Sequence, residues 1–163
     1  LHDALPICVF DIYNTFLKLG FDGINPMGKG RGEMIYMGKY WRITRKAIQK
    51  TFPVMPALKY DYPKVMKHFF SPEDNWDNVF PTLFPQWDRT PRAGKNEGIY
   101  VNATPKNFEH HIEDALLLIK NKSEQRKLLF LRSWNEWGEG NYVEPDTKYG
   151  HGFLNAIRDA IIK

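Results

Sequence analysis

Apolar residues along this chain recur at spacings that predict alternating helices and strands. Four segments repeat apolar side chains at helical spacing, and we expect each of them to be a helix. They are residues 9–19, 61–70, 105–120 and 152–162. The third follows Thr104 and begins on Pro105. Because threonine is a good N-cap and proline is favoured at the first helical position, this helix has the clearest start.

Four short apolar runs between these helices predict β-strands. They are residues 21–26, 78–84, 98–102 and 127–132. The last run is apolar without interruption from Leu128 to Leu131, which is typical of a strand buried on both faces of a parallel sheet. Residues 27–58 are rich in Gly and Lys, so we expect a long excursion there with at most one short helix.

The order of these elements predicts right-handed crossovers and parallel strands. A doubly wound sheet and a β/α barrel both have this order. Three of the four strands lead at their C-terminal ends into polar or aromatic clusters, and a β/α barrel builds its active site at that rim. We therefore expect an α/β fold over residues 8–163: the C-terminal half of a (β/α)8 TIM barrel, with about four parallel strands and flanking helices.

The beginning of the chain predicts a piece of a longer protein. It does not start with Met, and residues 1–7 resemble translated adapter sequence more than protein. We expect those residues to be non-native and the N-terminal half of the domain to be missing. A half barrel would leave two sheet edges open, so we expect it to be inactive and poorly soluble by itself.

Composition narrows the class of protein. With 163 residues, of which 42% are hydrophobic, the chain is long enough for one globular domain. The net charge of +4 is scattered, so we expect no nucleic-acid partner. No apolar run approaches the roughly 20 residues of a membrane span. The single cysteine, Cys8, excludes a disulfide framework and fits a cytoplasmic setting, while the oligomeric state is not indicated.

Two carboxylates lie three positions apart, just after the last predicted strand. Glu136 and Glu139 are flanked by Trp134, Asn135 and Trp137. Cleavage of a glycosidic bond needs one protonated and one ionised carboxyl group, and neighbouring tryptophans exclude water and raise a carboxyl pKa. Glycines follow Trp137 and Glu139, and they permit the turn that would bring both carboxylates to one site. The alternative is a solvated acidic loop.

Other polar and aromatic side chains at the predicted rim are candidates for binding sugar, each with an alternative role in fixing a loop. They are Asp22, Asn25, Trp87, Asp88, Arg89, Glu144, Asp146 and His151. His110 and His111 lie inside the helix of residues 105–120, where we expect surface or packing roles. No His, Asp and Glu set has metal-ligand spacing, and no glycine-rich loop matches a phosphate cradle, so no metal or cofactor is expected.

At these residues the chain closely resembles the WbsX family, whose members are called glycosyltransferases and are related to glycoside hydrolase family 99. The matching stretches are residues 20–22, 60–62, 87–92, 104–105 with 108, 133–140 with 144–146, and 149–150 with 153–154. The resemblance implies a (β/α)8 barrel and a bacterial enzyme of lipopolysaccharide O-antigen or other surface-polysaccharide metabolism.

The resemblance also implies roles for the two glutamates. Glu136 is similar to the base that assists the neighbouring sugar 2-hydroxyl in the hydrolases, and Glu139 to the general acid/base. That mechanism retains configuration through an epoxide-like intermediate. Gly138 stands where the hydrolases have His, so one substrate contact differs. We predict a carbohydrate-active enzyme that acts on glycosidic bonds by transfer or hydrolysis; the alternative is a non-catalytic carbohydrate-binding barrel.

Overall fold

The computed structural model describes residues 13–52, 56–96 and 98–163. Residues 13–18 are helical, as expected for the C-terminal part of the 9–19 segment. Residues 9–12 of that segment, Cys8 and the proposed non-native residues 1–7 lie outside the described residues.

The strands are short and form separate parallel pairs. β1 (Leu58–Asp61) pairs with β3 (Gly98–Val101), and β2 (Thr82–Leu83) pairs with β4 (Phe130–Leu131). The expected 21–26 strand is reduced to one parallel bridge between Ile24 and Val79. The chain is therefore a mixed α/β fold of short parallel strand pairs with flanking helices, and its described residues form no closed barrel.

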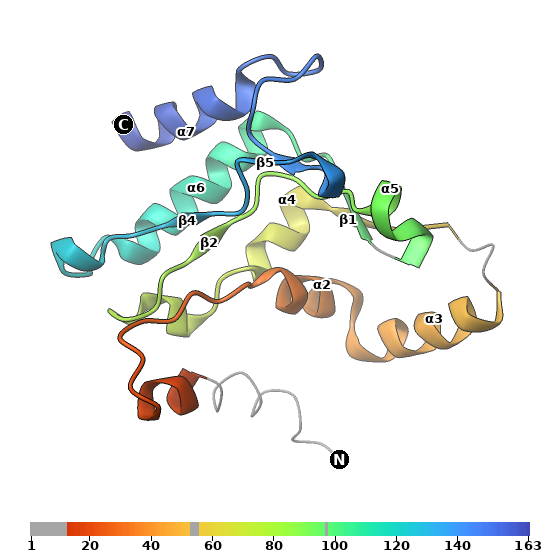
Figure 1. Ribbon diagram of the computed structural model, residues 1–163, viewed down its shortest axis with the longest axis horizontal. Coiled ribbons are helices and arrows are strands. Elements are labelled where there is room, and N and C mark those ends of the chain that lie inside the picture. The colour runs from red at the N-terminus through yellow and green to blue at the C-terminus, as the bar shows by residue number, and fades with distance from the viewer. Residues whose placement is uncertain (1–12, 53–55, 97) are drawn as a thin grey trace.

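Two long helices cover one side of the β2–β4 pair (Figure 1). α6 (Pro105–Ile119) and α7 (Gly152–Ile162) lie where the sequence predicts them, and Thr104 Oγ1 accepts a hydrogen bond from Asn107 N as the N-cap of α6. Their apolar faces meet in a core that includes Phe108, Ile112 and Phe153, all at most 1% exposed. None of the helices in the described ranges is long and apolar enough to cross a membrane.

The expectation of at most one short helix in residues 27–58 is wrong. This region forms α2 (Lys29–Met37) and α3 (Lys39–Thr51), and α3 extends away from the rest of the molecule (Figure 1). Gly32, one of the two glycines in α2, serves close packing. A Cβ at Gly32 would lie 2.6 Å from Phe69 Cδ1, so only glycine fits against this ring.

The 61–70 segment is helical only in part, because β1 occupies its first residue. It forms α4 (Tyr62–Val65) and the 3₁₀ turn η1 (Met66–His68). Further short helical turns connect the strands. They are η2 (Pro72–Asn75), α5 (Thr90–Ala93), η3 (Gly94–Asn96) and η4 (Glu124–Arg126).

The 127–132 segment differs most from its prediction. Only β4 is regular strand, and Leu128 and Phe130 are 50% and 48% exposed, so the segment is not buried on both faces. Beyond it, β5 (Asn135–Glu136) and β6 (Asn141–Tyr142) form an antiparallel hairpin around the 3₁₀ turn η5 (Trp137–Glu139). This hairpin carries both candidate carboxylates.

Candidate functional site

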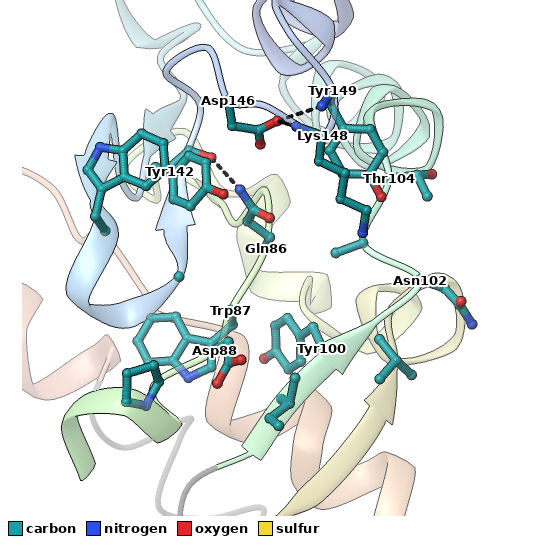
Figure 2. A pocket seen from close by; sticks show the side chains of 16 residues that line it. Gln86, Trp87, Asp88, Tyr100, Asn102, Thr104, Tyr142, Asp146, Lys148 and Tyr149 are labelled. Atoms are coloured by element: carbon teal, nitrogen blue, oxygen red, sulfur yellow. Dashed lines mark hydrogen bonds between the residues drawn. The ribbon is translucent and has the colours of Figure 1, made fainter. Parts of the chain in front are cut away.

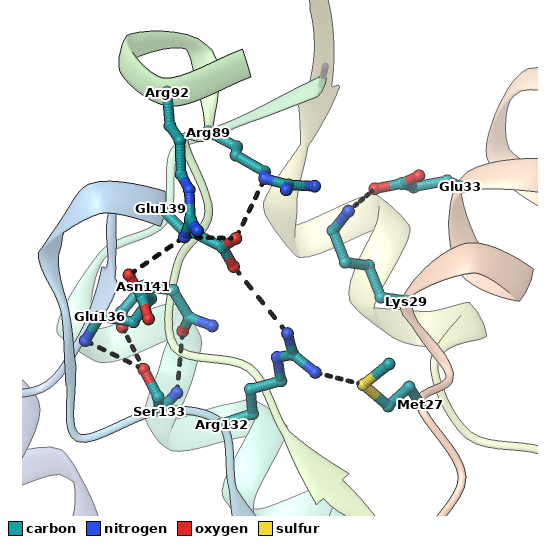
Figure 3. A network of polar contacts seen from close by, with 10 residues as sticks. All are labelled: Met27, Lys29, Glu33, Arg89, Arg92, Arg132, Ser133, Glu136, Glu139 and Asn141. Carbon is teal, nitrogen blue, oxygen red and sulfur yellow. Dashed lines mark hydrogen bonds and ion pairs between the residues drawn. The ribbon is translucent and has the colours of Figure 1, made fainter.

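The hairpin brings Glu136 and Glu139 to one guanidinium group (Figure 3). Arg92 Nη1 lies 3.8 Å from Glu136 Oε1 and 3.5 Å from Glu139 Oε1. The two carboxylate oxygens are therefore at most about 7.3 Å apart, the sum of these distances. That limit is compatible with the separation of roughly 5–9.5 Å found between glycosidase carboxyl groups.

The chain reversal between β5 and β6 depends on Gly140, which follows Glu139 at the end of η5. This residue has φ +52°, in the left-handed region, and its N–H donates to Trp137 O at 3.0 Å. A Cβ here would lie 2.9 Å from both Cβ and N of Asp88. The Asp88 N–H also donates to Glu139 O at 2.9 Å, so the hairpin is docked directly on the chain that follows β2.

The carboxylate of Glu139 is buried among three arginines (Figure 3). Its Oε1 lies 3.0 Å from Arg89 Nε and 3.5 Å from Arg92 Nη1. Its Oε2 lies 3.9 Å from Arg132 Nη2. The Glu139 side chain is 10% exposed, whereas that of Glu136 is 46% exposed. The two carboxylates therefore share a neighbour but differ in their access to water.

Asn141 and Ser133 hold the base of the hairpin. Ser133 N donates to Asn141 Oδ1 at 3.1 Å, and Ser133 Oγ donates to the Asn141 carbonyl at 2.6 Å. The same Oγ accepts from Glu136 N at 3.1 Å, which fixes the backbone of that glutamate. Asn141 Nδ2 is buried and has no hydrogen-bond partner in the described part of the chain. Figure 3 shows it pointing toward the side on which Glu139 and Arg132 lie.

The predicted aromatic residues of the hairpin are half-exposed. Trp134 is 53% and Trp137 is 48% exposed. One face of Trp137 stacks on Tyr142, with ring centroids 3.7 Å apart and an interplanar angle of 19°. Its Nε1 donates to Glu144 Oε2 at 2.7 Å, so Glu144 orients this ring. Asn135 is exposed and lies opposite Tyr142 in the hairpin.

The Trp87-Asp88-Arg89 segment lies beside the hairpin, and all three of its side chains already have protein contacts. Trp87 is 5% exposed, with Lys29 Nζ 4.0 Å from its ring centroid. Asp88 Oδ1 accepts from the N–H and hydroxyl of Thr90 at 3.0 and 2.6 Å, so this carboxylate fixes the start of α5. Arg89 reaches the carboxylate of Glu139.

Asp22 lies apart from the other predicted site residues. It occupies an exposed bend just before the parallel bridge of Ile24 with Val79, and its carbonyl accepts from Arg126 Nη1 at 3.0 Å. It is therefore at the N-terminal end of the strands, whereas Glu136 follows the C-terminal end of β4. Asn25 donates through Nδ2 to Phe80 O at 2.7 Å, which fixes the connection.

A cavity of about 630 Å³ adjoins the hairpin (Figure 2), and its volume is typical of a small-ligand site. Its wall includes Trp87 and Asp88, Tyr100 of β3 and Asn102 just after it, Trp137, Gly140 and Tyr142 of the hairpin, and Asp146, Lys148 and Tyr149 of the next loop. The cavity thus lies next to the turn between the carboxylates, although neither carboxylate is part of its wall.

Sequence reasoning missed several residues of this region. Arg132 could have been found, because it ends a predicted strand as other site candidates do. Lys29 could not, because it reaches Trp87 from the glycine-rich α2. Glu33, on the same helix, lies 3.0 Å from Lys29 Nζ and accepts from the Tyr100 hydroxyl at 3.1 Å. Burial raises the pKa of Tyr100 well above its usual value.

The two adjacent histidines take the surface and packing roles expected of them. His110 is exposed and lies 3.0 Å from Glu113. His111 is fully buried and stacks on Phe70 at 4.8 Å, and burial lowers its pKa to about 3. Among the residues that the structure describes, no three His, Cys, Asp or Glu side chains are grouped to hold a metal ion.

Comparison with known protein families finds one that matches most of the chain. The family described as Glycosyltransferase WbsX matches residues 14–157. Two curated relatives, from the B100 and ATCC 33913 strains of Xanthomonas campestris pv. campestris, are each called uncharacterized protein WxcX and are 30% identical over 86 residues. That match covers 52% of this chain but only 12% of each relative. No solved structure matches the chain.

Proposed function

Because the chain belongs to the WbsX glycosyltransferase family, we propose that it carries the paired glutamates of a carbohydrate-active enzyme in bacterial surface-polysaccharide or lipopolysaccharide O-antigen biosynthesis. The observation that carries the proposal is the position of Glu136 and Glu139 on either side of Arg92. Reaction at a glycosidic bond uses two such carboxyl groups, one to move a proton at the leaving oxygen and one to assist attack.

The different surroundings of the two glutamates support different roles. In this proposal the exposed Glu136, anchored through Ser133, is the base toward the 2-hydroxyl of the sugar. Glu139 is the general acid/base at the glycosidic oxygen, as the likeness to the family 99 hydrolases implies. A general acid must be neutral when it donates its proton. Substrate binding must therefore take over part of the arginine contacts that Glu139 makes.

The surroundings of the hairpin support binding of a sugar. Half-exposed Trp134 and Trp137 offer apolar ring surface, and Asn135 and Glu144 add polar groups beside them. Trp87, Asp88 and Arg89 border the same region. We propose that they mainly support the residues that contact the sugar. The position of Asp22 at the other end of the strands does not support binding of the same sugar.

We also propose that the strand pairs are the C-terminal half of a (β/α)8 barrel. The β1–β3 and β2–β4 pairs are parallel, and the carboxylates follow the C-terminal end of β4. Active sites of such barrels lie at that end of the strands. Further strands would have to complete the barrel, so catalysis would need more of the protein than this half.

The test is an assay of the protein as its gene encodes it, with polysaccharide and with sugar-nucleotide donors. Glu136→Gln and Glu139→Gln should each lower kcat by roughly 100-fold or more, since each removes a proton-transfer group. Glu124→Gln, at an exposed site on η4, is the matched control and should leave kcat unchanged. Product analysis would separate transfer from hydrolysis. Wild-type activity in both test variants would refute the proposal.

A non-catalytic carbohydrate-binding role is the second candidate. It is favoured by the half-exposed tryptophans and by the cavity beside the hairpin. In that case the unmodified protein would turn over no glycan, and its glycan affinity would be the same after either glutamate is replaced. The two functions therefore give opposite results in the same set of variants.

A further inference from the structure

Arginine side chains, which can only donate hydrogen bonds, contact Glu139, and Lys29 lies nearby in an ion pair of 3.0 Å with Glu33 (Figure 3). Arg92 comes from α5, Arg132 follows β4, and Lys29 begins α2. Lys29 Nζ and Arg132 Cζ lie 4.0 and 5.9 Å from the centroid of the same Trp87 ring. We refer to Lys29, Arg92 and Arg132 as the cationic cluster. Three separate segments of the chain thus place positive charge at one end of the candidate site.

The two arginines of this cluster make only long contacts to carboxylates, although Arg132 Nη1 also donates to Met27 Sδ at 2.5 Å. The contacts of Arg92 to the two glutamates measure 3.5 and 3.8 Å, and that of Arg132 to Glu139 measures 3.9 Å. Charge-assisted hydrogen bonds are about 2.7–2.9 Å long. The side chains of Arg92 and Arg132 are also 59% and 41% exposed. Their guanidinium groups are therefore accessible to an anion from solution.

The side-chain amide of Asn141 gives independent evidence for a bound hydrogen-bond acceptor at this site. Its Nδ2 is fully buried on the same side as Arg132 and has no partner among the described residues. A buried donor without a partner costs about 1–3 kcal/mol, so an acceptor in the bound state would recover that cost. A ligand oxygen beside Arg132 is such an acceptor.

We propose that the substrate of this site is an anionic saccharide, whose carboxylate or phosphate group binds Arg92 and Arg132 beside Lys29. The inference rests on the proposed function and names the substrate class for the same site. Arginine binds carboxylate and phosphate in a bidentate manner, which a neutral sugar hydroxyl cannot match. The anionic group takes the contacts of Arg92 and Arg132 from Glu139, which keeps its 3.0 Å contact with Arg89. The added negative charge beside Glu139 also favours its protonated form.

The test measures equilibrium binding by the protein as its gene encodes it, with two matched pairs of probes. One pair is glucuronate and glucose, and the other is glucose 1-phosphate and methyl glucoside. At low salt, at least one anion should bind about tenfold tighter than its neutral match. Preference for glucuronate alone identifies a carboxylate, and preference for glucose 1-phosphate alone identifies a phosphate. Equal binding within both pairs would overturn the inference.

Substitutions test whether the cationic cluster causes the preference for anionic over neutral sugars. Arg92→Gln and Arg132→Gln should each reduce it about tenfold, while Arg158→Gln on the exposed side of α7 should leave it unchanged. Glu139→Gln removes the competing carboxylate, so it should tighten anion binding several-fold while it stops turnover. Loss of turnover together with equal affinity for anionic and neutral sugars would refute the anionic class and leave the proposed catalytic pair standing. Anion preference without turnover by any form would refute only the catalytic proposal.

Discussion

Gly140 is the residue on which the geometry of the carboxylate pair depends most directly. It combines a left-handed backbone with close contact to Asp88. Gly150 has a similar φ of +53°, but a Cβ added there would meet no atom within 4 Å. Substitution of Gly150 therefore tests backbone strain alone, whereas substitution of Gly140 tests strain together with steric conflict.

Gly140→Ala should destabilise the protein more than Gly150→Ala. Both substitutions place a Cβ on a left-handed residue, at a cost of about 1–2 kcal/mol. At Gly140 the new methyl also overlaps Asp88, which should add roughly another 1–3 kcal/mol as in an overpacked core. Urea unfolding of the two variants measures the difference. Equal losses would mean that the hairpin does not dock on Asp88 as described.

His111 should make stability depend on pH. Burial lowers its pKa from 6.5 to about 3 in the folded state. Below pH 6.5 the unfolded chain therefore binds a proton that the folded chain does not, so stability falls as the pH falls from 6.5 toward 3. The loss between pH 7 and 5 should be about 2 kcal/mol.

His111→Gln is the variant that isolates this effect, because glutamine still offers an acceptor to Phe84 N, which lies 3.4 Å from His111 Nε2. Urea unfolding at pH 7 and 5 should show a smaller pH dependence in this variant. A slope unchanged by His111→Gln would show that the imidazole is not buried as a neutral group.

The residues of the site differ in how far the sequence could reveal them. Glu136 and Glu139 could be identified from the sequence, because their spacing, the flanking tryptophans and the glycines are all local signals. Lys29 and Asn141 were not, because the first reaches the site through a long-range helix contact and the second through burial. Such positions depend on tertiary packing rather than on neighbours in sequence.

At the scale of elements, α6 shows the strongest agreement between pattern and structure. Its N-cap, its first-turn proline and its apolar repeat all agree, so local preference and burial favour the same element. α2 shows the opposite case. Its two glycines disfavour a helix locally, so composition predicted a loop. Close contact with Phe69 nevertheless requires one of them, Gly32. The paired strands are too short for a period-two pattern to define their ends.

The packing of α6 predicts an asymmetric response to truncation. Ile112 is 1% exposed in the core between α6 and α7, whereas Leu117 on the same helix is 67% exposed. Ile112→Ala should cost about 2–5 kcal/mol of unfolding free energy, and Leu117→Ala less than about 0.5 kcal/mol. Urea titrations of both variants test this. Similar losses at both sites would contradict the packing of α6 on α7.

At the scale of the whole molecule, the described strand pairs leave apolar edges that are unpaired and exposed to solvent. β4 pairs with β2 on one side, and no other strand of the described residues pairs with it. Leu128 and Phe130 lie along this segment and are about half exposed. Unpaired apolar edges promote association between chains. The proposed barrel would cover this surface, so the exposure of Leu128 and Phe130 is what the half-barrel proposal predicts.

The 163-residue chain should therefore associate with itself through this edge. Sedimentation velocity should show a sedimentation coefficient that rises with protein concentration. Combining Leu128→Lys with Phe130→Lys should shift the chain toward monomer, since lysine is a common edge-blocking residue. Leu117→Lys removes an equally apolar but helical side chain and should have no such effect. If that control dissociates the chain equally well, general surface hydrophobicity rather than the β4 edge drives association. A parent chain that stays monomeric at all concentrations would refute the open-edge argument.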